Sequence, residues 1–535
     1  MATLEAPVRP RTSSSSSSQS HQGPFINEPF YDFRHEDNAR KMRSAIERVR
    51  GQLGREYDLI IGGKRVKTAD KIKSLNPSHP SEIVGIHQKA GKEHVEPAMA
   101  AALQAFESWS RTKVEDRAGL LFRTADLMRQ RKMDYMAWLV FEVSKNWAEA
   151  DADISETIDF LEFYAREALR LSKAETPVQL PGERDSLIYV PLGVGAVIPP
   201  WNFPCAIMAG MTVASIVSGN TVILKPSSDS PTIAAKFIEL LEEAGIPEGV
   251  VNFCPGAGAS FGDAIVAHPK TRYVAFTGSR EVGLHINKTA ATQAPGQLWI
   301  KRTVLEMGGK DAIIVDADAD IDSAVEGVAQ AAFGFQGQKC SACSRAIVDE
   351  RIYDKFLEQL KARVEKITIG DPAENANMGA VINEGSMKTI LAYIEQGKKD
   401  GRVITGGERA TAAGEGFYIQ PTVIADIPAK SKLEQEEIFG PVLAVMRARD
   451  FEDAMRIANE IPFGLSSSIQ TSNISRVFEF VQRAEAGLLT VNLPSAGVEY
   501  QLPFGGSKDS SFGPKEQGPA AMDFYSDWKT IYLKY

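Results

Sequence analysis

The residues most able to do chemistry lie in the stretch 337–343, GQKCSAC, where Cys340 follows a glycine and a lysine just after the apolar run 331–335. A cysteine thiolate is a strong nucleophile toward carbonyl carbon atoms. A cysteine is also often a small buried apolar residue, so this stretch alone leaves both interpretations open. The neighbouring Cys343 is read as a packing or redox-sensitive residue rather than a second nucleophile.

A lone carboxylate in the motif LEMGGK, at 305–310, could serve such a nucleophile as a general base. Glu306 lies between apolar residues and paired glycines, where burial would raise its pKa toward neutrality. The alternative is a glutamate that caps a helix or pairs with a lysine. In the motif PPWNFP, at 199–204, prolines and aromatic residues fix Asn202, whose amide could hold an oxyanion. Otherwise Asn202 only caps the next helix.

Elements of an α/β fold must position these residues. Apolar stretches, each followed by a glycine or proline and then a helical stretch, predict parallel strands at 194–198, 221–224, 250–253 and 273–276. Ala, Leu, Glu and Arg predominate in segments that predict helices at 37–53, 93–109, 115–145 and 149–172. Ligands of a parallel sheet bind beyond the carboxyl ends of its strands, where the motifs lie.

Two strand ends carry residues that suit a dinucleotide. The motif TGSREVG, at 277–283, opens a helix after a strand, and the backbone N–H groups there could hold a pyrophosphate. Lys225 follows another strand and could bind ribose hydroxyls. Each observation has an alternative. The motif at 277–283 could be a helix start with no ligand, and Lys225 could be a solvated lysine at a strand end.

The remaining segments complete the organisation. The stretches 178–180 and 187–190, with the turn PGERD between them, predict a β-hairpin. Residues 1–24, with six consecutive serines, predict a disordered arm. The arm could be a transit peptide to the mitochondrial matrix, but Arg9 and Arg11 are its only basic residues before His21, so a cytoplasmic location is favoured.

Composition excludes several classes of function. A formal net charge of -9 argues against a nucleic-acid partner, and no uncharged apolar run is long enough to span a membrane. The four cysteines, at 205, 254, 340 and 343, are too few and too irregularly spaced for a disulfide framework or paired zinc hooks. We therefore expect free thiols, a reducing compartment and no metal.

Taken in order, the motifs resemble those of the aldehyde dehydrogenase superfamily from about residue 56 to the end. The resemblance rests on PWNFP at 200–204, KPSS at 225–228, FTGSREVG at 276–283, LEMGGK at 305–310, GQKC at 337–340, EEIFGPV at 436–442 and PFGGSK at 503–508. It implies Cys340 as the nucleophile, Glu306 as the general base, and Asn202 with the Cys340 backbone N–H as the oxyanion hole. The cofactor residues that it implies are Pro200, Trp201, Lys225, Ser227, Ser228, Gly278, Ser279, Gly283, Gly308, Glu437 and Phe439.

The family fold implies a Rossmann-like cofactor domain, an α/β catalytic domain and a small β oligomerisation flap. We assign residues 25–175 and 191–304 to the NAD(P)-binding domain and 305–490 to the catalytic domain. Residues 176–190 and 491–535 would form the flap. A homodimer or higher homo-oligomer acting on a small aldehyde is expected.

The substrate resemblance is mosaic. Most of the chain is similar to bacterial 1-pyrroline-5-carboxylate dehydrogenases, which oxidise L-glutamate γ-semialdehyde. The segments 491–500 and 510–518 instead resemble 2-oxoglutarate semialdehyde dehydrogenases, so the loop 493–502 should discriminate an amino from a keto group. The implied substrate residues are Glu142, Phe203, Lys339, Ser341, Ser495, Ala496, Gly497 and Phe504. An inactive dinucleotide-binding protein and a cofactor-independent thiol esterase are remote alternatives.

The cofactor expectation is NAD, with NADP tolerated. Many family members have a glutamate three residues after the ribose-binding lysine, whereas this chain has Ser228. Without that carboxylate, a 2'-phosphate meets less repulsion.

Overall fold

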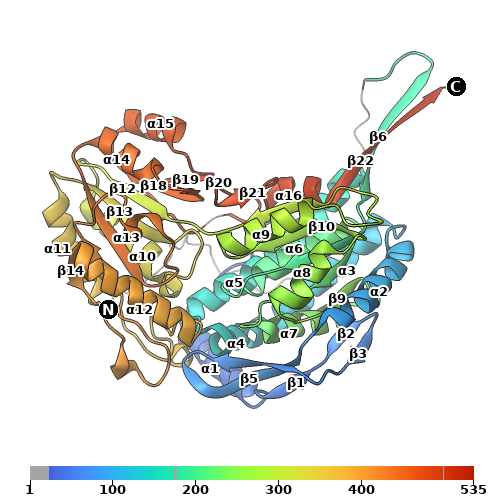
Figure 1. Cartoon of the computed structure of the whole chain (residues 1–535), viewed down its shortest axis with the longest axis horizontal. Coiled ribbons are helices and arrows are strands. Elements are labelled where there is room, and N and C mark those ends of the chain that lie inside the picture. The colour runs from blue at the N-terminus through green and yellow to red at the C-terminus, as the bar shows by residue number, and fades with distance from the viewer. Residues whose placement is uncertain (1–22, 174–177, 498, 535) are drawn as a thin grey trace.

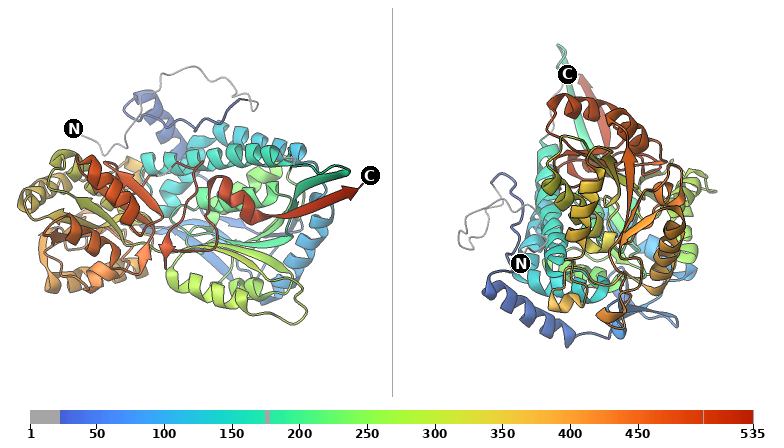
Figure 2. Two further views of the ribbon diagram at one scale, coloured as in Figure 1. Left: turned by 90° about the horizontal axis from the view of Figure 1, so that it is seen from above. Right: turned by 90° about the vertical axis from the view of Figure 1, so that its left-hand side faces the viewer.

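A computed structural model describes residues 23–173, 178–497 and 499–534 (Figure 1). Except for Gly23 and Pro24, the predicted disordered arm lies outside the described residues. Two large sheets covered by helices lie side by side, and a two-stranded ribbon projects beyond them (Figures 1 and 2). No helix in the described ranges has the length and apolar character to cross a membrane.

The predicted helices of the N-terminal part are present with one break. They are α1 (Glu36–Arg50), α2 (Val95–Trp109), α3 (Val114–Gln130), α4 (Lys132–Val143) and α5 (Trp147–Ser172). The single helix predicted for 115–145 is two helices, because Arg131 leaves the helical conformation at φ -118°. A small sheet packs beside them, formed by β1 (Arg55–Tyr57), β5 (His79–Gln88) and β4 (Lys71–Asn76).

The first large sheet contains all four predicted parallel strands. Its order is β21 (Ser511–Phe512), β11 (Arg302–Glu306), β10 (Thr271–Thr277), β7 (Val194–Ile198), β8 (Thr221–Leu224), β9 (Val251–Phe253), β2 (Leu59–Ile61) and β3 (Lys64–Val66). The crossover helices are α6 (Ala206–Val217), α7 (Pro231–Ala244), α8 (Asp263–Ala267) and α9 (Arg280–Ala291). Strands β7 and β8 are buried throughout, as a parallel sheet with both faces covered requires.

The second large sheet has its own buried core on each face. Its order is β14 (Arg402–Thr405), β15 (Thr422–Ala425), β16 (Val442–Ala448), β13 (Cys343–Asp349), β12 (Asp311–Val315), β18 (Ser466–Gln470) and β19 (Leu488–Val491). The helices around it are α10 (Ile321–Phe333), α11 (Tyr353–Val364), α12 (Glu384–Asp400), α13 (Lys432–Gln435), α14 (Phe451–Asn459) and α15 (Ile474–Arg483).

The chain crosses between the two sheets at residues 307–310. Strand β11 of the first sheet ends at Glu306, and β12 of the second sheet begins at Asp311. Cys340 lies just before β13, which pairs with β12. The topology therefore brings the predicted base and the predicted nucleophile to the junction of the sheets.

The predicted hairpin within 176–190 is wrong in its pairing. Residues 178–180 form no strand, and β6 (Glu183–Pro191) pairs over its whole length with β22 (Ser526–Lys534). The side-chain amide of Gln179 instead bonds to the backbone of Asp185. A nine-residue C-terminal strand offers a longer ladder than three residues can, so the distant partner is preferred.

The C-terminal segment divides among several places. Helix α16 (Gly518–Tyr525) leads into β22, while β21 joins the first large sheet and β20 (Ser507–Lys508) pairs with β17 (Phe463–Gly464). Only part of 491–535 thus lies in the projecting ribbon. The division into cofactor, catalytic and flap domains stays a prediction.

Candidate active site

The loop before Cys340 has an unusual backbone. Phe335, Gln336 and Gly337 have φ values of 49°, 57° and 67°. Residues other than glycine rarely adopt this left-handed backbone conformation. A Cβ at Gly337 would collide with the Gly440 carbonyl. The buried Gln336 amide donates to two backbone carbonyls, at 3.1 and 2.8 Å. Packing and hydrogen bonds therefore hold the loop in one conformation.

The surroundings of Cys340 favour the neutral thiol. Burial raises the pKa of the Cys340 thiol, and the carboxylates of Asp311, Glu306 and Glu437 raise it further. The backbone N–H of Ser341 acts in the opposite direction. A thiol in such a place needs a base to become a nucleophile.

Glu306 has the properties of that base. Burial raises its pKa well above the usual range, and Glu516 adds to this effect. Ser511, paired with Glu306 across β11 and β21, donates its hydroxyl to Glu306 Oε2 at 2.5 Å. Glu306 Oε1 is buried and has no hydrogen-bond partner among the described residues. One oxygen is thus fixed, and the other is able to accept a proton.

Asn202 lies beside the nucleophile loop. It follows β7, is 4% exposed, and donates from Nδ2 to the Gln338 carbonyl oxygen at 3.1 Å. That bond holds the amide two residues from Cys340. An amide nitrogen carries two hydrogens, so the second can serve an oxyanion.

The predicted ribose and pyrophosphate residues share the carboxyl edge of the first sheet. Lys225 follows β8, and burial lowers its pKa to about 8. Its Nζ donates to the Pro226 carbonyl at 3.2 Å. Ser279 caps α9 by accepting from the Val282 N–H at 3.4 Å. The other residues at this edge or in the first turn of α9 are Pro200, Ser227, Ser228, Gly278 and Gly283.

The remaining predicted cofactor residues are Glu437 and Phe439, expected on the nicotinamide ribose side, together with Trp201 and Gly308. Glu437 accepts from the Gly309 N–H at 2.9 Å, and burial raises its pKa to about 7. Its carboxylate packs so closely on Gly308 that a Cβ there would collide with it. The rings of Trp201 and Phe439 meet edge to face at 5.4 Å. Glu437 therefore contacts Gly308, and Phe439, two residues further along the chain, contacts Trp201.

Several predicted substrate residues are close to Cys340. The Ser495 hydroxyl donates to the Ser341 carbonyl at 2.9 Å, which ties the loop 493–502 to the nucleophile loop. Lys339 Nζ is 2.9 Å from Glu149 and forms an ion pair with it. The ammonium expected to bind a substrate carboxylate is therefore partly neutralised by Glu149.

Aromatic residues line the same region. The rings of Phe203 and Phe335 lie 6.2 Å apart, and the buried Lys145 ammonium is 3.8 Å from the Phe203 ring centroid. Phe504 donates its backbone N–H to the Glu516 carbonyl at 2.6 Å. Two further predicted residues follow Ser495 toward the surface, namely Ala496, half-buried, and Gly497, exposed.

The predicted substrate role of Glu142 is not supported. Both of its carboxylate oxygens are used inside the protein, where they accept from Ser74 and from the backbone N–H groups of Thr232 and Ile233. Those N–H groups belong to the first turn of α7, so Glu142 satisfies a helix N-terminus. With three internal donors, the buried Glu142 carboxylate stabilises the fold and does not face a substrate.

The sequence reasoning missed Glu149, Ser511 and Glu516. Glu149 reaches Lys339 across 190 positions of sequence, and Ser511 reaches Glu306 across 205. Tyr525 donates to Glu516 at 3.0 Å, and burial raises the pKa of Glu516 to about 7. The sequence did contain a signal for Glu149, because acidic residues recur at intervals of three and four positions along α5.

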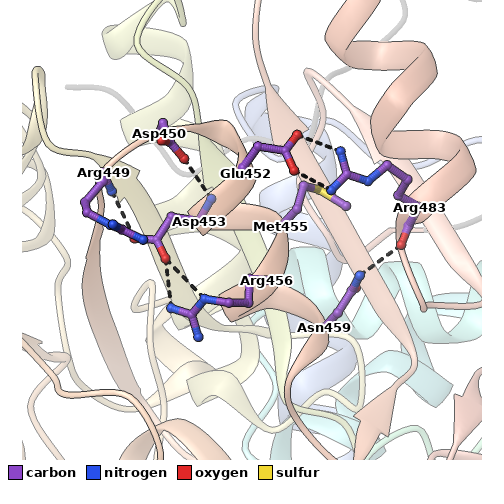
Figure 3. A pocket seen from close by; sticks show the side chains of 8 residues that line it. All are labelled: Arg449, Asp450, Glu452, Asp453, Met455, Arg456, Asn459 and Arg483. Carbon is purple, nitrogen blue, oxygen red and sulfur yellow. Dashed lines mark hydrogen bonds and ion pairs between the residues drawn. The ribbon is translucent and has the colours of Figure 1, made fainter.

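A pocket of about 410 Å³ lies elsewhere, over α14 and α15 (Figure 3). Its arginines are paired: Arg449 and Arg456 with Asp453, and Arg483 with Glu452. No cysteine is among its lining residues, and we do not assign the reaction to it. In the part of the chain that the structure describes, no three His, Cys, Asp or Glu side chains are grouped to hold a metal ion.

Comparisons with known proteins identify the family of the chain. The model of the aldehyde dehydrogenase family matches residues 65–531. A 1-pyrroline-5-carboxylate dehydrogenase of Geobacillus thermodenitrificans is 49% identical over 511 residues, covering 95% of this chain and 99% of the relative. 1-Pyrroline-5-carboxylate dehydrogenase 1 of Halalkalibacterium halodurans is 46% identical over 515 residues, covering 96% and 99%.

A solved structure is similar over nearly the whole fold. The 1-pyrroline-5-carboxylate dehydrogenase from Thermus with bound NAD superposes with a TM-score of 0.94 at 46% identity, covering 96% of this chain and 99% of that one. Fold, motifs and family model agree, and the chain belongs to the aldehyde dehydrogenase family.

Proposed function

We propose that this enzyme oxidises L-glutamate γ-semialdehyde, the open form of 1-pyrroline-5-carboxylate, to glutamate with NAD. The arrangement that carries the proposal has three parts. Glu306 lies close enough to Cys340 to raise the pKa of its thiol, Glu306 Oε1 has no partner among the described residues, and Asn202 is held beside the nucleophile loop. The names of the relatives support the choice of aldehyde.

The first step is attack of the Cys340 sulfur on the aldehyde carbon. Glu306 Oε1 accepts the thiol proton, because its raised pKa makes it a competent base. The Asn202 amide and the Cys340 backbone N–H donate to the oxygen that becomes negative. The product is a thiohemiacetal on Cys340.

The residues at the cofactor edge fit NAD. Lys225 presents a buried ammonium for ribose hydroxyls, and the start of α9 offers backbone donors for the pyrophosphate. Glu437 would hold the nicotinamide ribose. When bound, NAD supplies the acceptor for the hydride that leaves the substrate carbon.

Loss of the hydride from the substrate carbon converts the thiohemiacetal into a thioester on Cys340, and Glu306 releases the thiol proton to solvent. The second step is hydrolysis of this thioester. Glu306 takes a proton from water as the water oxygen attacks the thioester carbon, and the carbon–sulfur bond breaks to give the acid and the Cys340 thiolate. Ser511 holds Glu306 Oε2 at 2.5 Å, so the carboxylate keeps its orientation through both proton transfers. Asn202 again holds the oxyanion.

Lys339, Ser341 and Ser495 would bind the substrate carboxylate. The ammonium of Lys339 is shared with Glu149, so part of the anchoring would come from hydroxyl and backbone donors in 493–497. The second candidate substrate is 2-oxoglutarate semialdehyde, favoured by the sequence of the loop 491–500.

Steady-state assays with both semialdehydes test the substrate assignment. We expect kcat/KM for L-glutamate γ-semialdehyde to be at least tenfold higher than for 2-oxoglutarate semialdehyde, with NADH formation followed at 340 nm. Cys340→Ala is the inactive control. The reverse preference would assign the enzyme to the keto substrate.

We also propose that NADP is accepted beside NAD, because Ser228 leaves out the carboxylate that would repel a 2'-phosphate. Ser228→Glu should lower kcat/KM for NADP much more than for NAD. A wild-type preference for NAD above about 1,000-fold, roughly 4 kcal/mol, would refute this.

We further propose a homo-oligomer in which the ribbon β6/β22 docks on a second copy. Its Trp528, Tyr532 and Leu533 are 49%, 72% and 52% exposed. The edge strand β19 and the apolar residues Ile474 and Phe478 of α15 offer a complementary surface. The double variant Trp528→Ser/Tyr532→Ser should be a monomer by light scattering, and an unchanged mass would refute this interface.

The compartment is proposed to be the cytoplasm. All four cysteines are free, and the named relatives are bacterial. Cell fractionation of the full chain tests this, and recovery in mitochondria would contradict it.

A further inference from the structure

The segment 23–33, here named the strap, is fastened along helix α5. Asp151 and Asp159 of α5 accept from the backbone N–H groups of Tyr31, at 2.5 Å, and Glu28, at 2.7 Å. The rings of Phe25 and Phe163 add an edge-to-face contact at 5.4 Å. The strap is therefore held by specific polar bonds as well as by packing.

Asn27 connects the strap to the loop 493–502. Its Nδ2 donates to Asp159 Oδ2 at 2.9 Å and to Gln501 Oε1 at 3.3 Å. One amide nitrogen has two hydrogens, so a single side chain can serve both acceptors. Strap, helix and loop thus meet at Asn27.

The same loop reaches the nucleophile at its other end. Ser495 donates to the Ser341 carbonyl at 2.9 Å, directly after Cys340. Between these two anchors, the Tyr500 ring packs on Phe160 of α5 at 6.0 Å. The described residues of this loop are therefore tied at one end to the nucleophile loop, through Ser495, and at the other to Asn27, through Gln501.

Helix α5 contacts both the nucleophile loop and the strap. Glu149, Asp153, Glu156 and Asp159 are spaced by four, three and three residues, which places them along one face of a helix. Glu149 pairs with Lys339 beside the nucleophile, and Asp159 holds the strap. The strap and the nucleophile loop are therefore both tied to helix α5, at different residues.

We propose that Asn27 is a positioning residue that sets substrate selectivity by fixing Gln501 and the loop 493–502. It contacts no reacting atom, so the chemical step should not depend on it. The inference rests on the proposed function only in taking the loop to contact the distal end of a carboxylate-bearing aldehyde.

The test compares Asn27→Ala with Ile26→Ala, a neighbouring strap residue that is 49% exposed. We expect Asn27→Ala to raise KM for L-glutamate γ-semialdehyde about fivefold, in the range of one hydrogen bond, with kcat within twofold. Propanal, which has no distal carboxylate, should be oxidised as by wild type. Ile26→Ala should leave both aldehydes unchanged. Equal losses with both aldehydes, or no change in KM, would overturn the proposal.

A double-mutant cycle with Gln501→Ala tests the route of the effect. If Asn27 acts through Gln501, Asn27→Ala should add little to the KM of Gln501→Ala, whereas additive effects would refute the coupling. Wild-type inactivity toward both semialdehydes would instead refute the proposed substrate. The same variants would then be compared on the carboxylate-bearing aldehyde that the enzyme oxidises fastest.

Discussion

Removal of the Ser511 hydroxyl should move the pH dependence of hydrolysis. Ser511 donates to Glu306 Oε2 at 2.5 Å and lowers the pKa that burial raises. In Ser511→Ala the buried carboxylate loses this donor. A hydrogen bond to a charged group contributes about 1.5–3 kcal/mol, so its loss should displace the acidic limb of the pH profile by about 1–2 pH units.

The sign of the effect follows from the role of the base. Only the carboxylate form of Glu306 can accept a proton, so kcat falls as the pH drops below its pKa. A higher pKa moves this acidic limb toward higher pH by the same 1–2 units. At a pH on the limb, each unit lowers the carboxylate fraction, and hence kcat, about tenfold.

The assay is the pH profile of kcat, combined with rapid-mixing measurement of NADH. If hydrolysis becomes slower than acylation, Ser511→Ala should show a burst of about one NADH per Cys340. Ser507→Ala is the matched control, because the Ser507 hydroxyl donates to the Gly464 and Glu485 carbonyls rather than to Glu306. An acidic limb that stays at the wild-type pH would refute the assignment of Glu306 as the hydrolytic base.

Three further changes probe the surroundings of the site. Glu142→Gln should lower the free energy of unfolding by about 1–3 kcal/mol while KM stays unchanged, since Glu142 serves the first turn of α7; a changed KM with unchanged melting temperature would contradict this. Glu149→Gln should free Lys339 and lower KM for carboxylate-bearing aldehydes but not for propanal; a raised KM would mean that the pair itself positions the substrate. Burial raises the pKa of Glu156 to about 8, so stability from this group is present below about pH 4.5 and is lost as the pH rises through 8. Glu156→Gln should therefore raise the melting temperature at pH 8 by a few degrees and less at pH 5, and an equal shift at both would contradict the raised pKa.

The sequence predicted the parts of the molecule that depend on local pattern. The strands that became β7 and β8 were located to the residue, because a buried parallel strand is a short apolar run bounded by a turn. The motif around Cys340 was recognised because its residues are contiguous. The helix expected at 115–145 required only one break, at Arg131.

Contacts between distant residues could not be predicted in this way. Glu142 was assigned to the substrate from its motif, yet its donors come from residues 74, 232 and 233. The strand β6 was given a neighbour three residues long, while its partner β22 begins more than 300 positions later. Local propensity cannot rank such pairings, because their stability depends on the whole ladder and on burial.

In the proposed reaction, Cys340 forms a covalent thioester, which is hydrolysed by water that Glu306 deprotonates. Glu306→Gln lacks the base for both steps, so its acylation should be slow and its hydrolysis slower still. After prolonged incubation with L-glutamate γ-semialdehyde and NAD and quenching in acid, it should carry one glutamyl group. Peptide mass spectrometry should locate it on Cys340. A glutamyl group on Cys343, or complete NADH formation with no acylated peptide at any time point, would rule out Cys340 as the nucleophile.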